Sequence, residues 1–178
     1  MSCQSDNSLL TRFPFIRDTW LTERLDYCSA NIVVGLSLIC VTVRALGVRQ
    51  RAAAMAAVGS IIALVAWHLS YMLAIKFDYG WNMKFCLTLG LFNSASWVVF
   101  CQSTQHPHRW RLYRFLLLMY AALLLEVLDF PPFFMLFDAH ALWHATTIPL
   151  VYLFYSFLHG DVEWVSALRQ LRNDKILS

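Results

Sequence analysis

Five runs of apolar residues, each of the length that crosses a lipid bilayer, constrain this chain more than any other feature. They span residues 27–43, 52–75, 85–101, 112–128 and 133–158. A helix needs about 20 residues to cross the hydrocarbon, with a range of about 17 to 25. Apolar residues make up 59% of the 178 and charged residues only 14%, whereas a soluble domain has about a quarter charged residues. The sequence therefore predicts an all-α integral membrane bundle of five transmembrane helices.

The basic residues predict how this bundle is oriented. Nine of the fourteen Lys and Arg residues lie between the first and second runs, between the third and fourth, at the beginning of the fourth (Arg114), or after the last. Segments rich in Lys and Arg stay on the cytoplasmic side of the membrane. We therefore expect residues 1–25 to be a short lumenal segment, 26–158 the transmembrane domain and 159–178 a cytoplasmic tail. Basic segments this short and scattered indicate topology and do not indicate nucleic-acid binding.

Two histidines lie four residues apart inside the last apolar run. On a helix, His140 and His144 share one face and lie about 6 Å apart. That spacing lets both imidazoles bind one metal ion. Ionisable groups are costly to bury in a membrane span, so those that occur there are candidates for a function. The alternative is that both rings only form hydrogen bonds between packed helices. The pair, with Asp138 just upstream, favours a metal site.

Further polar residues are expected near the same, lumenal side of the bundle. His68 lies in the second run, Asp26 precedes the first, and Glu126 and Asp129 end the fourth. A rise of 1.5 Å per residue places His68 and the histidine pair about 10 to 16 Å below the lumenal surface. Other roles stay open, because His68 would also serve as a hydrogen-bonding group between helices and Asp26 as a helix N-cap. Asp78 and Asp129 would equally serve as solvated loop acids or helix caps.

Histidines and carboxylates in one such layer support metal-assisted hydrolysis. A catalytic zinc typically has three protein ligands and one water, whose pKa it lowers toward neutrality. A nearby carboxylate can then take the proton of that water. A site below the lumenal headgroups would reach an ester or amide bond of a lipid. No G-x-S-x-G motif is present in the sequence, so a serine lipase is not indicated.

Several short motifs resemble those of one membrane-protein family. They are residues 17–18, 21–23, 25–27, 75–80 (IKFDYG), 128–132 (LDFPP), 138–144 (DAHALWH) and 147–149 (TIP). Together they extend over about residues 15–160 and resemble the post-GPI attachment to proteins factor 3 family. That family belongs to the CREST superfamily of seven-helix membrane hydrolases. The resemblance implies that the five helices of this chain correspond to the last five of those seven.

The resemblance also implies an activity. It indicates a GPI-specific phospholipase A2 that removes the sn-2 acyl chain from the GPI lipid by zinc-dependent ester hydrolysis. GPI-anchored proteins and their lipid would be the substrate, and membrane lipids would surround the enzyme. The implied location is the Golgi membrane, with the endoplasmic reticulum membrane as the alternative.

Carried over by position, His140 and His144 match the HxxxH zinc ligands of the superfamily. Asp26 matches the aspartate that positions or deprotonates the zinc-bound water. Phe15 stands where the superfamily has its third histidine, and a phenyl ring cannot bind a metal. Thr11 stands where the superfamily has a serine, so Thr11 and Asp26 are the expected catalytic residues.

The third zinc ligand is left open by the resemblance. His68, at a suitable depth, or a water would have to supply it. The family's cysteine-rich lumenal segment and first two helices are not expected here, and residues 1–14 resemble an alternative N-terminal segment. Two other functions therefore stay open: a non-catalytic, truncated membrane isoform that binds partners, and a transporter or proton relay that uses the buried histidines and acids.

Overall fold

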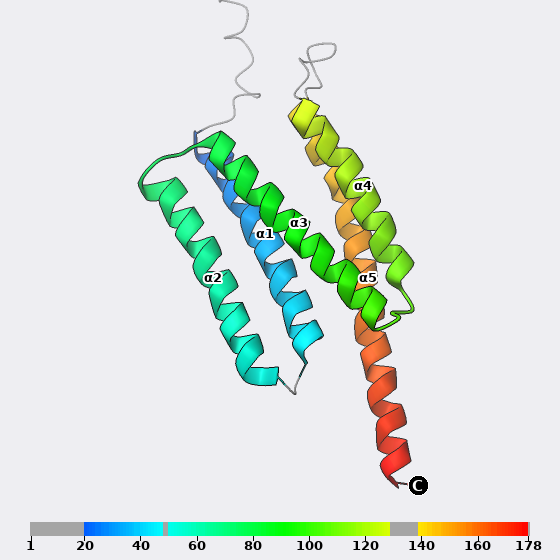
Figure 1. The fold of residues 1–178 in the computed structure, drawn as a ribbon. Coiled ribbons are helices and arrows are strands. Elements are labelled where there is room, and N and C mark those ends of the chain that lie inside the picture. Colours follow the sequence, from blue (N-terminus) through cyan, green and yellow to red (C-terminus); the bar gives the residue numbers. More distant parts are fainter. Residues whose placement is uncertain (1–19, 48–49, 129–138, 178) are drawn as a thin grey trace, which may run out of the picture. The chain divides into compact units, whose positions relative to one another are not determined.

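The computed structural model of the chain describes residues 20–47, 50–128 and 139–177, and these residues form helices without a strand among them. The helices are α1 (Trp20–Leu46), α2 (Arg51–Ala74), α3 (Tyr79–Ser103), α4 (Arg109–Leu128) and α5 (Ala139–Leu177) (Figure 1). The prediction of an all-α protein with five helices is confirmed.

Four of the five helices are long and apolar enough to cross a membrane, over Arg24–Leu46, Arg51–Ala74, Tyr79–Ser103 and Ala141–Lys175. These lengths and compositions fit a multi-pass membrane protein. α4 has 20 residues, which cover about 30 Å at 1.5 Å per residue. It carries three arginines in its first turns and Glu126 near its end, so its crossing of the membrane stays a prediction.

The chain forms two compact units, divided between Leu91 and Phe92 inside α3. In the first unit, α1 and α2 lie side by side and run in opposite directions (Figure 1). α1 ends at Leu46 because Gly47 takes a φ of 62° and donates its N–H to the oxygen of Val43 at 3.1 Å. Glycine adopts this left-handed conformation without the steric cost of a Cβ.

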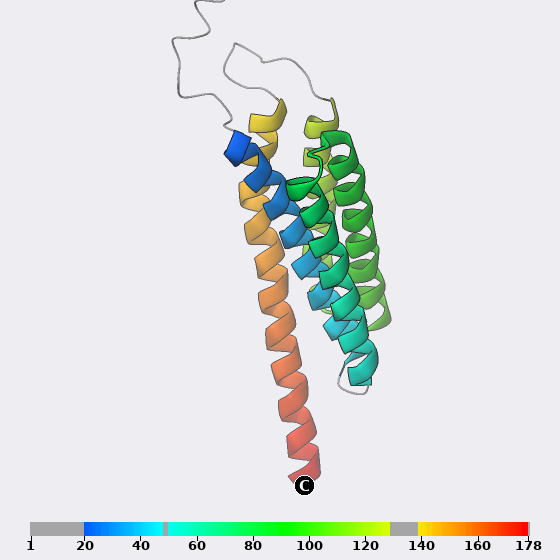
Figure 2. The same cartoon turned by 90° about the vertical axis from the view of Figure 1, so that its left-hand side faces the viewer.

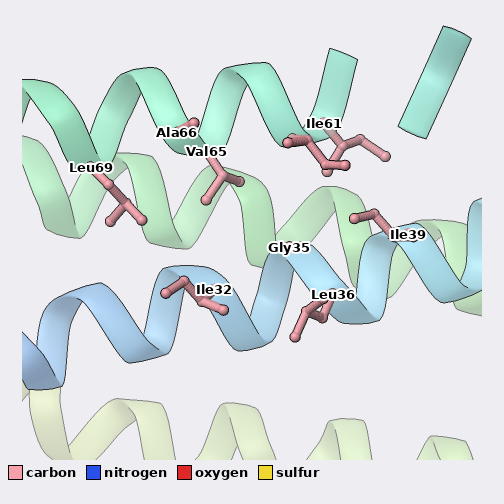
Figure 3. Close-up of a pocket in the computed structure, with 9 residues that line it drawn as sticks. Ile32, Gly35, Leu36, Ile39, Ile61, Val65, Ala66 and Leu69 are labelled. Atoms are coloured by element: carbon pink, nitrogen blue, oxygen red, sulfur yellow. The ribbon is translucent and has the colours of Figure 1, made fainter. Parts of the chain in front are cut away.

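The pairing of α1 with α2 depends on a small residue. A Cβ added at Gly35 would lie 3.1 Å from Cγ2 of Val65, and small residues let membrane helices approach closely. Beside this contact is a groove of about 200 Å³ (Figure 3). Its lining is apolar, from Ile32, Gly35, Leu36, Ile39, Ile61, Ile62, Val65, Ala66 and Leu69. The groove therefore offers apolar contact and no acid–base chemistry.

In the second unit, α4 and α5 pack along each other, and α5 extends beyond the beginning of α4 (Figure 1). Figure 2 shows α5 as one continuous helix to the C-terminal end. Residues 159–177, expected as a tail, thus continue α5 as a helix. The core of this unit is aromatic, because the Trp97 and Phe157 side chains are almost completely buried and meet edge to face at 5.2 Å between ring centroids. Such pairs add about 0.5–1.5 kcal/mol beyond area burial.

The one glycine of the second unit, Gly160 in α5, lies in a crowded place. A Cβ added there would lie 2.6 Å from Cδ2 of His108 and 3.0 Å from its Cγ. His108 belongs to the connection between α3 and α4, so a bare backbone at Gly160 lets this connection lie against α5.

Replacing Gly160 with alanine should destabilise this unit, because the His108 ring would have to move. Overpacking costs about 1–3 kcal/mol, and the better helix propensity of alanine returns about 1 kcal/mol. We expect a net loss of about 1 kcal/mol, measured as a lower Tm in detergent micelles. Gly59→Ala in α2 is the matched control, because its Cβ would meet no described atom within 4 Å. A Tm for Gly160→Ala equal to that of Gly59→Ala would contradict the contact.

Candidate functional site

The predicted metal-binding pair lies at the beginning of α5. The helix starts at Ala139 and continues through both histidines, so His140 and His144 are one turn apart on the same side. The His144 side chain is exposed, and the side chain of His140 lies outside the described residues. This backbone arrangement fits two imidazole ligands of one metal ion.

Asp26 is half-buried inside α1 rather than at its end. Since α1 begins at Trp20, the interpretation of Asp26 as a helix N-cap is wrong. Asp26 and His68 belong to the first unit, whereas His140 and His144 belong to the second.

Part of the predicted site falls on residues that the structure does not describe. Thr11, Phe15, Asp129 and Asp138 lie outside the described residues. Within residues 20–47, 50–128 and 139–177, no group of three or more His, Cys, Asp or Glu side chains is arranged to hold a metal ion. The predicted set needs the His140 side chain as well, so the zinc site stays a prediction.

His68 is completely buried and forms hydrogen bonds between helices. Its Nε2 lies 3.0 Å from Oδ1 of Asn82 on α3, and the same oxygen accepts a hydrogen bond of 2.8 Å from Nδ2 of Asn31 on α1. The His68 ring also stacks on Phe85, with centroids 3.7 Å apart and an angle of 5° between the planes. The interpretation of His68 as a group that hydrogen-bonds between helices is confirmed, and its metal role stays a prediction.

Sequence reasoning missed the two asparagines that hold His68. Asn31 is 0% and Asn82 4% exposed. The available signal was an amide side chain inside a membrane-length helix, where a polar group needs a partner. We call these three residues the Asn31–His68–Asn82 cluster.

The connection between α2 and α3 is fixed by Asp78, which caps α3. Its Oδ1 accepts the N–H of Trp81 at 3.0 Å, and its Oδ2 lies 3.3 Å from Nζ of Lys76. The capping interpretation of Asp78 is confirmed. The hydrogen bond from the Trp81 N–H, and then that from Lys76, lower the pKa of the Asp78 carboxyl below its ordinary value.

Aromatic contacts tie the first turns of α1 to this same connection. The ring of Tyr27 lies 5.6 Å from that of Phe77 and 5.5 Å from that of Tyr79, between centroids. The guanidinium of Arg24 lies 5.1 Å from the centroid of Phe77, in range of a cation–π interaction. These contacts hold the turn that carries Asp26 beside the loop before α3.

A second buried polar pair lies in the second unit. Nε2 of His106 lies 3.1 Å from Oδ1 of Asp161, and the two residues are only 1% and 4% exposed. Nδ1 of His106 accepts the N–H of His108 at 3.1 Å, so Nε2 carries the hydrogen and donates it to the carboxylate. Trp164 covers the ring edge to face at 4.6 Å. This pair ties the α3–α4 connection to α5, and sequence reasoning did not identify it.

Comparison with known proteins identifies the family. Residues 10–162 match the Per1-like family. This chain belongs to the Per1-like family. The resemblance to the post-GPI attachment to proteins factor 3 family is thereby confirmed.

Three relatives illustrate the relationship of this Per1-like chain to known proteins. "GPI-specific phospholipase A2-like PGAP3" from Danio rerio is 43% identical over 82% of this chain and 46% of the relative. The Homo sapiens protein of the same name is 40% identical over the same shares. "Post-GPI attachment to proteins factor 3" from Drosophila melanogaster is 36% identical over 78% of this chain and 43% of the relative. The chain thus spans less than half the length of these relatives, and no solved structure matches it.

The Asp78 cap gives this Per1-like chain an acid-sensitive contact. Because its folded pKa is lowered, the carboxylate stabilises the fold above the unfolded pKa of about 3.9, and this contribution is lost as the pH falls through the folded pKa. Asp78→Asn keeps a good N-cap without the charge. We expect the Tm of the wild type to fall more steeply than that of Asp78→Asn below about pH 4, and Asp78→Ala to have a lower Tm at every pH. Parallel Tm profiles for wild type and Asp78→Asn would refute the role of the charge.

Proposed function

We propose that this chain acts in GPI-anchor remodelling and hydrolyses the sn-2 ester of the GPI lipid. The observation that carries the proposal is the His140–His144 pair on a continuous helix, in a chain about 40% identical to relatives named GPI-specific phospholipase A2-like. We place the protein in the Golgi membrane, with the endoplasmic reticulum as the alternative, and its N-terminus in the lumen. GPI-anchored proteins are the proposed substrates.

In this proposal each site residue has a separate task. His140 and His144 would hold a zinc ion, which when bound supplies a Lewis acid for the ester carbonyl and lowers the pKa of water. Asp26 accepts the proton of the attacking water and passes it to the leaving glycerol oxygen, so that a fatty acid and a lysolipid are released. Thr11 offers a hydroxyl at the position of the superfamily serine.

Asp26 is suited to this task by its surroundings. It is half-buried, five residues before the buried Asn31, and the Tyr27 and Arg24 contacts hold its turn against the loop before α3. A carboxylate on a rigid helix needs little reorganisation to meet a reacting group.

A second candidate function rests on Phe15. A chain with a phenyl ring at the third histidine position lacks one imidazole of the superfamily set, and a catalytic zinc typically has three protein ligands. The alternative is a membrane protein that binds partners without catalysis.

Expression of this chain in cells that lack full-length PGAP3 tests both functions. We expect this chain to restore removal of the sn-2 acyl chain from GPI lipids, measured by mass spectrometry of released GPI anchors. His140→Ala and His144→Ala should each reduce this activity more than about 100-fold, since loss of partners that only orient metal ligands costs about 10–100-fold.

His159→Ala is the matched control, because His159 lies on the same helix and is exposed, with its Nδ1 3.5 Å from Oε1 of Glu163. It should keep full activity. Full activity in His140→Ala would eliminate the proposed site. No activity, with the chain present in the membrane at wild-type levels, would favour the non-catalytic function.

A further inference from the structure

The hydrogen bonds of the Asn31–His68–Asn82 cluster have only one consistent direction. Nδ2 of Asn31 lies 2.9 Å from the main-chain oxygen of Tyr27 and 2.8 Å from Oδ1 of Asn82. The Tyr27 oxygen can only accept, so the Asn31 amide must present its nitrogen, and Asn82 must present its oxygen. An amide oxygen only accepts hydrogen bonds. Nε2 of His68, 3.0 Å from that oxygen, therefore carries a hydrogen and donates it.

Two acceptor atoms of the cluster have no protein donor. Nδ1 of His68 and Oδ1 of Asn31 are both buried and have no hydrogen-bond partner among the residues that the structure describes. The His68 ring cannot turn toward another donor, because it is stacked on Phe85 and held through Nε2. Buried polar atoms almost always bind a protein group or an ordered water. The cluster therefore presents two acceptors whose directions are fixed.

The hydrogen-bonding character of Nδ1 of His68 and Oδ1 of Asn31 determines which kind of ligand fits the cluster. Both are acceptors, so an anion or a carbonyl group cannot satisfy them. The three side chains of the cluster are uncharged when His68 is neutral, and a buried cation without a counter-charge is strongly disfavoured. A neutral O–H donor, from water or from a lipid hydroxyl, satisfies such an acceptor without bringing charge into the membrane.

His68 and Asn82 lie near the helix ends on either side of the loop between α2 and α3. Asn82 lies in the first turn of α3, which begins at Tyr79, and α2 ends at Ala74. His68 is thus about 9 Å from the end of α2 at 1.5 Å per residue. His68 and Asn82 therefore lie on either side of the loop that contains Asp78, each within two turns of the helix end next to that loop.

We propose that the Asn31–His68–Asn82 cluster is a binding site for a neutral O–H donor, with Nδ1 of His68 as its main acceptor. This use of Nδ1 replaces a role for His68 as the third zinc ligand. It stands whether or not the chain hydrolyses GPI lipids, because it rests on the contacts of the cluster alone.

The test is nuclear magnetic resonance of the full chain, with ¹⁵N-labelled histidine, in bilayers of phosphatidylcholine, which has no O–H or N–H donor. We expect the His68 ring to carry its hydrogen on Nε2, to show a hydrogen-bonded Nδ1, and to receive magnetisation from water. A hydrogen-bonded Nδ1 that appears only after phosphatidylinositol is added would assign the donor to a lipid hydroxyl. A protonated Nδ1, a bare Nδ1 in both membranes, or a large shift of the Nδ1 signal on addition of Zn²⁺ would each overturn the proposal.

Two variants separate the ligand from the scaffold. His68→Gln keeps a donor that reaches Asn82 but has no Nδ1, so the ¹⁵N signal of the hydrogen-bonded Nδ1 should disappear with little change in Tm, which assigns that signal to His68. Asn82→Leu removes the acceptor that fixes the ring, and His68 should then show a mixture of both tautomers. A pure Nε2–H tautomer in Asn82→Leu would contradict the proposed role of Asn82. The wild-type spectrum alone decides the proposal if a variant fails to fold.

Discussion

The requirement that polar groups in the hydrocarbon find hydrogen-bond partners shapes this chain at two levels. The main chain meets it by forming helices. Hydroxyl side chains meet it within their own helix, as Thr42 does by donating to the oxygen of Leu38 at 2.7 Å and Thr88 by donating to that of Lys84 at 2.7 Å. The buried rings of His68 and His106 are not satisfied in this way, and neither is the Asn82 amide. They need partners on other helices, so they determine which helices meet.

Each unit contains such a contact among the described residues. In the first, the Asn31–His68–Asn82 cluster joins α1, α2 and the first turn of α3. In the second, the pair of His106 with Asp161 joins the α3–α4 connection to α5, one residue from the close approach at Gly160. Apolar side chains pack against lipid almost as well as against each other, so they specify helix register weakly. Directional hydrogen bonds supply the register that apolar packing leaves open.

The sequence predicted those features of the fold that are local. Apolar runs predicted all five helices, because hydropathy directly measures which stretch of a helix suits the hydrocarbon of a membrane. Helix ends were less predictable, since α1 begins at Trp20 and α5 continues to Leu177, where polar residues can stay helical in the headgroup layer or in water. The N-cap interpretation of Asp26 failed for this reason, whereas that of Asp78 succeeded because the loop before α3 is short. The partners of His68 and His106 are distant in sequence, and no sequence periodicity predicts them.

The same distinction between local and distant contacts governs the candidate site. The spacing of His140 and His144 is a property of one helix, so the sequence alone predicts that both imidazoles lie on one face. The rest of a metal set must come from other segments, and His68 shows how such a residue can be committed elsewhere. Its Nε2 is hydrogen-bonded to Asn82, and its other ring nitrogen, Nδ1, can either bind a metal ion or accept a hydrogen bond. One lone pair cannot serve both. If Nδ1 of His68 accepts a hydrogen bond, a zinc ion held by His140 and His144 would need water as its third ligand. The metal affinity of this chain would then rest on two imidazoles.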